Sequence, residues 1–205
     1  FLGKPLAALM TSLQNGLTSM SSGGSAMILG VILGLMMCFD MGGPVNKAAY
    51  LFATAGLNPD SPPTMEIMAA VMAAGMVPPL AISVATFLRP RLFTKAEVEN
   101  GRSAWLLGLS FITEGVIPFA AADPLRIIPA TMAGGAVTGA LSMAMHVGSR
   151  APHGGVFVFF AIENFLGFVL AILAGMVVSA ALVVVLKSAK KKSPTPNYQD
   201  RKSVV

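Results

Sequence analysis

The chain has 205 residues, of which 55% are hydrophobic and only 11% are charged, and its net charge is +5. Soluble domains carry about 25% charged residues, so this deficit places the chain among membrane proteins. The basic residues gather beside apolar runs, at positions 89–102 and 187–192, with few aromatic residues between them. That distribution argues against a nucleic-acid-binding protein and is typical of the positive residues that orient membrane spans.

The sequence carries few signs of metal or cofactor chemistry. Cys38 is the single cysteine, so a disulfide or a multi-cysteine metal site within the chain is excluded. No phosphate-loop or HExxH motif occurs, and we expect no metal and no cofactor. The chain starts at Phe1 without a charged leader, so we expect no signal peptide and interpret the chain as the C-terminal part of a longer protein.

Residues 1–25 form an amphipathic segment, in which apolar residues recur at helical spacing before a Ser/Gly-rich stretch. We expect an interfacial helix there. Residues 26–39 are uncharged but short for a crossing, which needs about 20 residues. We expect them to run outward, with Gly30 and Gly34 in a helix contact.

Residues 40–57 combine a Gly-Gly-Pro break with a short apolar segment. Gly42 and Gly43 cannot continue a helix, whereas Pro44 suits the first turn of a new one. The apolar segment 45–57 is too short to cross, which is the signature of a re-entrant element. Residues 58–63 are an exposed loop by composition.

Three further apolar segments are long enough to span a bilayer or nearly so: residues 67–88, 127–147 and 165–186. Between the first two lie a charged stretch, 89–102, which we expect to be a cytoplasmic loop, and an apolar stretch, 103–122. The lysine-rich residues after 186 should also be cytoplasmic, as the start of a polar tail, 187–205.

The number of membrane crossings between the positively charged segments constrains the topology. The last two spans leave and return to the cytoplasm, so residues 103–122 must enter and leave on one face. The same count puts residues 40–63 on the outer side. We therefore expect an all-α integral membrane protein with about four transmembrane helices and two re-entrant hairpins that enter from opposite faces, an arrangement that many transporters use to build a binding site at the midplane.

Glu114, inside the second re-entrant stretch, is the leading candidate for a functional residue, because an acid in an apolar run is costly without a partner or cavity. The alternative is a buried structural ion pair. Asp40, Asn46 and Lys47 form a second polar set, although Asp40 and Lys47 could simply pair with each other. His153 lies between small residues that let a ligand approach, but a histidine in a turn is more often exposed and inert.

Other polar residues have structural interpretations. Glu163 and Asn164 could face the same cavity, but capping of the last span is at least as compatible with their position. Asp123 reads as the cap of the helix that follows it. His146 and Cys38 are interpreted as structural.

Three motifs resemble a known family. Residues 39–50 read FDMGGPVNKAAY, residues 111–126 read FITEGVIPFAAADPLR, and residues 152–155 read PHGG. In this order they resemble the fructose-specific membrane subunit, enzyme IIC, of the bacterial phosphoenolpyruvate-dependent sugar phosphotransferase system. Thr113 and Glu114 look like the Thr-Glu motif that holds a sugar on a re-entrant hairpin in the wider glucose-type superfamily.

The resemblance implies a function and partners. Such a subunit is a multi-pass homodimer in the bacterial inner membrane with a cytoplasmic C-terminus, and residues 26–186 would be the C-terminal part of its membrane transport domain. It binds fructose or a related hexose and presents it to a phosphorylated IIB domain, which is served by IIA and HPr. The implied binding residues are Asp40, Asn46, Lys47, Thr113, Glu114 and His153, with Glu114 also catalytic. Membrane lipid is the surrounding partner. The alternatives are an ion-coupled transporter in which Glu114 carries H⁺ or Na⁺, and a purely structural membrane subunit.

Overall fold

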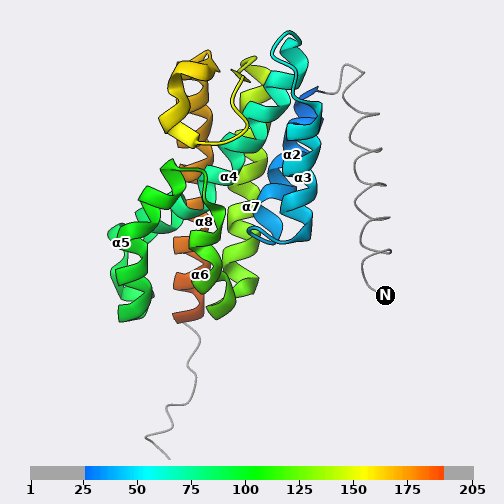
Figure 1. Ribbon diagram of the computed structural model, residues 1–205. Helices are drawn as coiled ribbons and strands as arrows, with labels where there is room; N and C mark the ends of the chain where they lie inside the picture. Colours follow the sequence, from blue (N-terminus) through cyan, green and yellow to red (C-terminus); the bar gives the residue numbers. More distant parts are fainter. Residues whose placement is uncertain (1–25, 192–205) are drawn as a thin grey trace, which may run out of the picture.

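The computed structural model describes residues 26–191, which form an α-helical bundle (Figure 1). The expected interfacial segment 1–25 and most of the tail, 192–205, lie outside the described residues. The elements in order are α2 (Ala26–Phe39), α3 (Pro44–Gly56), α4 (Pro62–Leu88), η1 (Pro90–Leu92), α5 (Lys95–Leu109), η2 (Thr113–Val116), α6 (Ile117–Ala122), α7 (Pro124–Ala144), β1 (Gly148–Ser149), η3 (Gly155–Ala161), β2 (Ile162–Glu163) and α8 (Phe165–Lys191).

Among the described residues, three helices are long and apolar enough to cross a membrane: α4, α7 and, over residues 165–189, α8. Helix α4 lies at the centre, with most of its side chains buried. It packs against both other long helices and against α5. The fourth expected span, α2, has 14 residues and is therefore only about 21 Å long, which is less than the hydrocarbon thickness.

The first hairpin consists of α2 and α3, which run into the bundle from one end and return to the same end (Figure 1). Residues 26–39 therefore run in the same direction as α4. The expectation that they cross outward, opposite to the span that follows, is wrong. The direction of α2 is set by its antiparallel contact with α7, in which Gly30 lies against Gly139 and Gly34 against Gly135. A side chain at these positions would meet backbone atoms of α7, so glycine permits the close packing.

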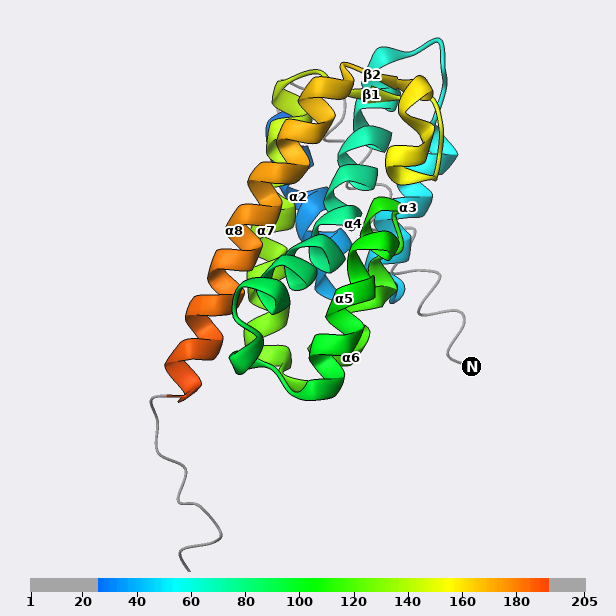
Figure 2. The same ribbon diagram turned by 90° about the vertical axis from the view of Figure 1, so that its left-hand side faces the viewer.

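The second hairpin enters from the opposite end of the bundle and consists of α5 followed by η2 and α6 (Figure 2). This agrees with the expectation that residues 103–122 enter and leave on one face. The expected loop 89–102, however, is mostly the start of α5. A capping box explains the helix: Thr94 accepts a hydrogen bond from the Glu97 amide, and the Glu97 carboxylate accepts one from the Thr94 amide.

Helix α8 continues through Lys187 to Lys191, past the expected end at residue 186. Lys187 explains the continuation, because its ammonium turns inward and lies 3.2 Å from the Glu97 carboxylate, in a pair that is largely buried. The ammonium also lies 4.3 Å from the centre of the Phe93 ring. These contacts join the end of α8 to the base of the second hairpin.

The polar residues at the opposite end are structural. Asn164 accepts a hydrogen bond from the Gly167 amide and so caps α8, as the sequence allowed. Glu163 pairs with Arg150 across the two-residue ribbon β1–β2. His146 lies 3.0 Å from Glu66.

Candidate functional site

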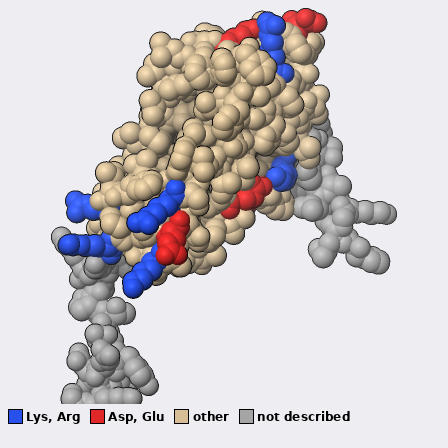
Figure 3. Space-filling model, turned by 60° about the vertical axis from the view of Figure 1, so that its left-hand side comes forward, with Lys and Arg blue, Asp and Glu red and all other residues tan. Residues whose placement is uncertain are grey.

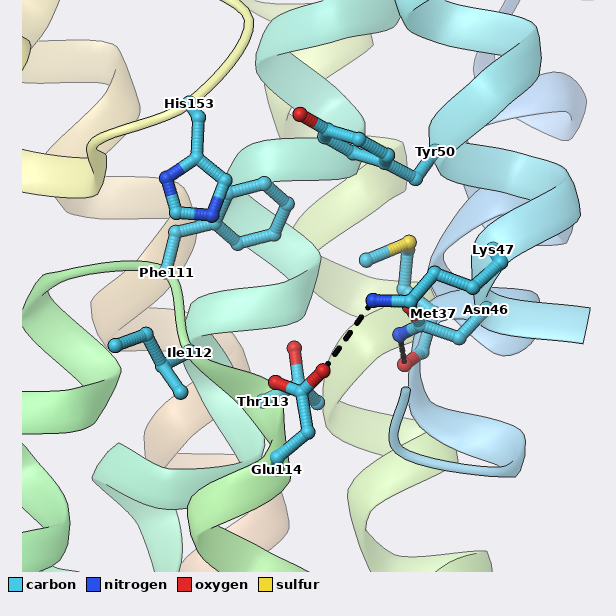
Figure 4. Close-up of a pocket in the computed structure, with 9 residues that line it drawn as sticks. All are labelled: Met37, Asn46, Lys47, Tyr50, Phe111, Ile112, Thr113, Glu114 and His153. Carbon is cyan, nitrogen blue, oxygen red and sulfur yellow. Dashed lines mark hydrogen bonds and ion pairs between the residues drawn. The ribbon is translucent and has the colours of Figure 1, made fainter. Parts of the chain in front are cut away.

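The turns of the two hairpins meet partway along the bundle and line an open cavity of about 360 Å³ (Figure 4). Both turns use left-handed backbone, at Met41 and Gly42 in the first hairpin and at Phe111 in the second. The loop before η3 closes a third side. The cavity is lined by Met37, Asn46, Lys47, Tyr50, Phe111, Ile112, Thr113, Glu114 and His153.

An ion pair joins the two hairpins at this cavity. The Lys47 ammonium, from the first turn of α3, lies 3.3 Å from the Glu114 carboxylate in η2. The side chains are 53% and 44% exposed, so neither charge is enclosed in the protein. This is not the fully buried structural pair that was the alternative interpretation of Glu114. Both groups remain open to a molecule in the cavity.

Thr113 fixes the second hairpin to the central helix. Its hydroxyl is buried and donates a 2.9 Å hydrogen bond to the carbonyl of Gly75 in α4. A side chain at Gly75 would meet the Phe111 ring, so this glycine lets the hairpin turn approach α4 closely. The position of Glu114 is therefore set by the two anchored residues that precede it, Phe111 and Thr113.

Asn46 is the corresponding fixed residue of the first hairpin. It is buried, and its side-chain amide donates a 2.7 Å hydrogen bond to the carbonyl of Met37 at the end of α2. The bond ties the two arms of the hairpin together immediately beside Lys47.

Asp40 does not line the cavity. Its two carboxylate oxygens accept hydrogen bonds from the amides of Val45 and Asn46, at 2.7 and 2.9 Å, and so satisfy free N–H groups at the start of α3. The possible Asp40–Lys47 ion pair is therefore replaced by a helix cap and a contact of Lys47 with Glu114. Asp40 can act on the cavity by orienting the first turn of α3.

Three rings form the wall opposite the ion pair. The Phe111 and His153 ring centres are 5.0 Å apart, and Tyr50 lies 6.0 Å from Phe111 and 6.3 Å from His153. Gly155 lets the loop that carries His153 lie close to the end of α5, because a side chain there would meet the backbone of Leu109. The sequence-based expectation included His153 but missed Tyr50 and Phe111. Tyr50 follows Lys47 by three residues on α3, a spacing that puts both on one face.

Asp123 stands just before α7 as expected, but its side chain makes no capping hydrogen bond, and its carboxylate instead lies 2.7 Å from Arg126. Arg126 also donates to the carbonyl of Leu186 in α8. Both residues lie at the base of the bundle and not in the cavity. Within residues 26–191, no cluster of His, Cys, Asp and Glu side chains could hold a metal ion.

The sequence matches a protein family over most of its length. Residues 1–134 match the model of the family described as phosphotransferase system, EIIC. The chain belongs to the EIIC family. It is therefore a membrane-embedded protein, in agreement with the three long apolar helices found among residues 26–191.

Among its curated relatives, the chain is 51% identical over 189 residues to the PTS system fructose-specific EIIB'BC component of Escherichia coli K12, covering 91% of this chain and 33% of the relative. It is 46% identical to the fructose-specific EIIC component of Haloferax volcanii, covering 91% of this chain and 49% of that protein. The fructose permease IIC component of Bacillus amyloliquefaciens is 44% identical, with 91% and 60% covered. This chain thus spans from a third to three-fifths of the length of these relatives. No solved structure gives a significant match.

Proposed function

We propose that this EIIC chain forms the sugar-binding part of a fructose-type permease that phosphorylates its substrate during import. The observation that carries the proposal is the Lys47–Glu114 pair in the cavity where the two hairpin turns meet. A carboxylate and an ammonium, both partly exposed, offer an acceptor and a donor to the hydroxyl groups of a sugar. The Tyr50, Phe111 and His153 rings offer a flat wall for its C–H groups.

In this proposal Glu114 is the catalytic residue. Its carboxylate accepts a hydrogen bond from the sugar hydroxyl that is to be phosphorylated, and takes its proton as the hydroxyl oxygen attacks phosphorus. The new O–P bond forms while the S–P bond of a phosphocysteine on the IIB domain breaks, and the cysteine leaves as a thiolate. Thr113 and Asn46 hold the two hairpin turns at the distance that this geometry requires.

The partner proposed as the phosphate donor is a IIB domain, supplied through IIA and HPr. Support comes from relatives in which IIB and IIC parts occur in one protein, as the name EIIB'BC states. Lys and Arg side chains gather at the lower end of the bundle, around η1, α5 and the end of α8 (Figure 3). The positive-inside rule makes that end cytoplasmic in this proposal. The second hairpin, which carries Glu114, then enters the bundle from the side on which the donor lies. We also propose a homodimer, by resemblance to the family.

The competing function is ion-coupled transport with Glu114 as the ion site. The fructose-specific names of the relatives do not favour it. The decisive experiment reconstitutes the complete polypeptide in liposomes and follows radiolabelled fructose. We expect uptake only when phosphoenolpyruvate and the soluble phosphorylating proteins are present, with fructose phosphate as the product. Uptake driven by an ion gradient, with free fructose accumulating, would overturn the proposal.

A further inference from the structure

A second hollow, of about 340 Å³, lies between the end of α4 and the end of α8. In the orientation proposed above, this is the cytoplasmic end of the bundle. Helix α4 stops at Leu88, and Pro90 then starts η1, which turns the chain back toward α8. The turn brings two guanidinium side chains to one place. The hollow is lined by Leu88, Arg89, Pro90, Arg91, Leu92 and Ser188.

An exposed apolar stripe on α8 leads to this hollow. Its largest members, between 45% and 69% exposed, recur at helical spacing: Leu166, Leu170, Leu173, Val177 and Val185. Ser188 follows Val185 by three residues and so continues the same face of the helix. The arginine hollow is therefore the polar end of a long apolar surface. Phe87 and Leu88, which are 58% and 67% exposed, add apolar surface beside it.

The stripe has the composition of a lipid-facing surface. Close contacts between membrane helices use small residues, and on α8 these face the protein: Gly175 lies against Gly134 and Thr138 of α7, and Ser179 lies against Gly134. The opposite side carries Leu and Val. A second helix would find no small residues among those five positions, whereas an acyl chain needs none.

The length of the stripe also fits one lipid chain. Eleven residues separate Val177 from Ser188, which is about 16 Å along a helix. Half of the hydrocarbon thickness of a bilayer is about 15 Å. A chain lying on α8 between these residues would thus reach from the arginines to the midplane, the depth of a single leaflet.

The charge at the hollow comes from Arg89 and Arg91. Lys187, next to Ser188 in sequence, points away and is paired with Glu97. Guanidinium groups suit a phosphate, to which they can donate two parallel hydrogen bonds. Basic hollows at the cytoplasmic ends of membrane helices are sites where anionic headgroups bind.

We propose that this hollow and the lower half of the α8 stripe bind one anionic phospholipid of the cytoplasmic leaflet, with its phosphate at Arg89 and Arg91 and one acyl chain along α8. The lipid would hold η1 against α8, at the base of the hairpin that carries Glu114. The site does not depend on the sugar or on phosphoryl transfer, so it can be tested separately from the proposed function.

The test uses native mass spectrometry of the complete polypeptide in detergent, titrated with phosphatidylglycerol or phosphatidylcholine. We expect one phosphatidylglycerol to bind in preference to phosphatidylcholine. Soluble glycerophosphoglycerol, which has the headgroup but no acyl chain, should not compete at the same concentration. Equal binding of the two lipids would overturn the proposal, and competition by the soluble headgroup would assign the hollow to a free phosphate ester instead.

A matched pair of variants locates the site. Arg89→Gln with Arg91→Gln should weaken phosphatidylglycerol binding about thirtyfold, since each arginine near an anionic lipid surface strengthens binding roughly fivefold and the two factors multiply. Lys95→Gln with Arg102→Gln removes the same charge from the neighbouring hollow and should leave binding unchanged. Equal losses in the two variants would mean diffuse attraction to the whole basic end, and would sink the proposal.

Discussion

The Nζ atom of Lys47 lies 3.3 Å from Oε1 of Glu114, although the two residues are 67 positions apart in the chain. Each belongs to a different hairpin, and the hairpins enter the bundle from opposite ends. The pair therefore joins two hairpins directly, each of which is also held in place separately, by Thr113 on α4 and by Asn46 on α2. In the proposed function a sugar must insert its hydroxyl groups beside or between these charges.

Glu114→Gln keeps the size of the side chain but removes its ability to accept a proton. We expect the rate of fructose phosphorylation to fall about a hundredfold or more, because general-base catalysis typically contributes that factor. Fructose binding should weaken much less. The measurement is phosphorylation by membranes supplied with phosphorylated IIB. Glu66→Gln, which changes an acid paired with His146 at the far end, is the control and should retain full activity.

Lys47→Met tests whether the two charges act together. We expect the single variant to lose activity, and the double variant with Glu114→Gln to lose less than the product of the two single losses, because the residues are in contact. The coupling free energy between the two residues is obtained by measuring the phosphorylation rate of the wild-type protein, both single variants and the double variant under the same conditions. Strictly multiplicative losses would show that the ion pair has no part in the reaction.

Gly42→Ala tests the contact between the hairpin turns. Gly42 has a φ of +103°, and a methyl group there would lie 2.6 Å from the Glu114 carboxylate. Both the backbone and the carboxylate would have to shift, so we expect sugar phosphorylation to be lost. Gly56→Ala, in the same hairpin but facing open space, should be silent. Comparable activity of the two variants would remove Gly42 from the site.

The second hairpin could be predicted from sequence because charge decides it: basic residues on both sides require an even number of crossings. The direction of α2 could not be predicted in this way, since an apolar helix without charged residues carries no signal for the face from which it enters. It depends on Gly30 and Gly34 meeting Gly139 and Gly135, which are about a hundred positions away in the chain. The start of α5 is not predicted, because a charged stretch favours a loop unless the capping box of Thr94 and Glu97 is recognised within it.

The cavity was predicted in large part. Glu114, Lys47, Asn46, Thr113 and His153 all line it, although their role in binding stays a prediction. Tyr50 and Phe111 were missed because an aromatic residue in an apolar run is more often part of the core. Asp40 was included for its charge, but charge alone cannot tell a ligand-binding acid from a helix cap.

Asp40→Ala tests the capping role. The change removes both acceptors at the start of α3, and we expect a loss of about 1 kcal/mol of stability. Because Asp40 acts on the cavity through Asn46 and Lys47, the KM for fructose should rise more than kcat falls. Asp40→Asn retains a side-chain oxygen that can accept one of these bonds, and should recover part of the affinity. A drop in kcat as large as that of Glu114→Gln would instead make Asp40 a direct participant.

Glu97→Gln tests the buried contact between the second hairpin and α8. Burial of the Glu97 carboxyl acts to raise its pKa, but the hydrogen bond from the Thr94 amide and the charge of Lys187 outweigh it, so the pKa lies below its usual 4.5. A carboxyl with a lowered pKa contributes stability above its unfolded-state pKa, and that contribution is lost as the pH falls through the folded-state value.

Glutamine at position 97 can still accept the hydrogen bond from the Thr94 amide but cannot form an ion pair with Lys187. At pH 7 we therefore expect a lower thermal midpoint for the variant, with a cost of roughly 3 kcal/mol for leaving a buried charge without its partner. The difference in thermal midpoint between the two proteins should narrow as the pH falls below 4.5, because the wild-type protein then loses the same interaction. A gap that stays constant down to the acid limit of folding would show that the ion pair is not its cause.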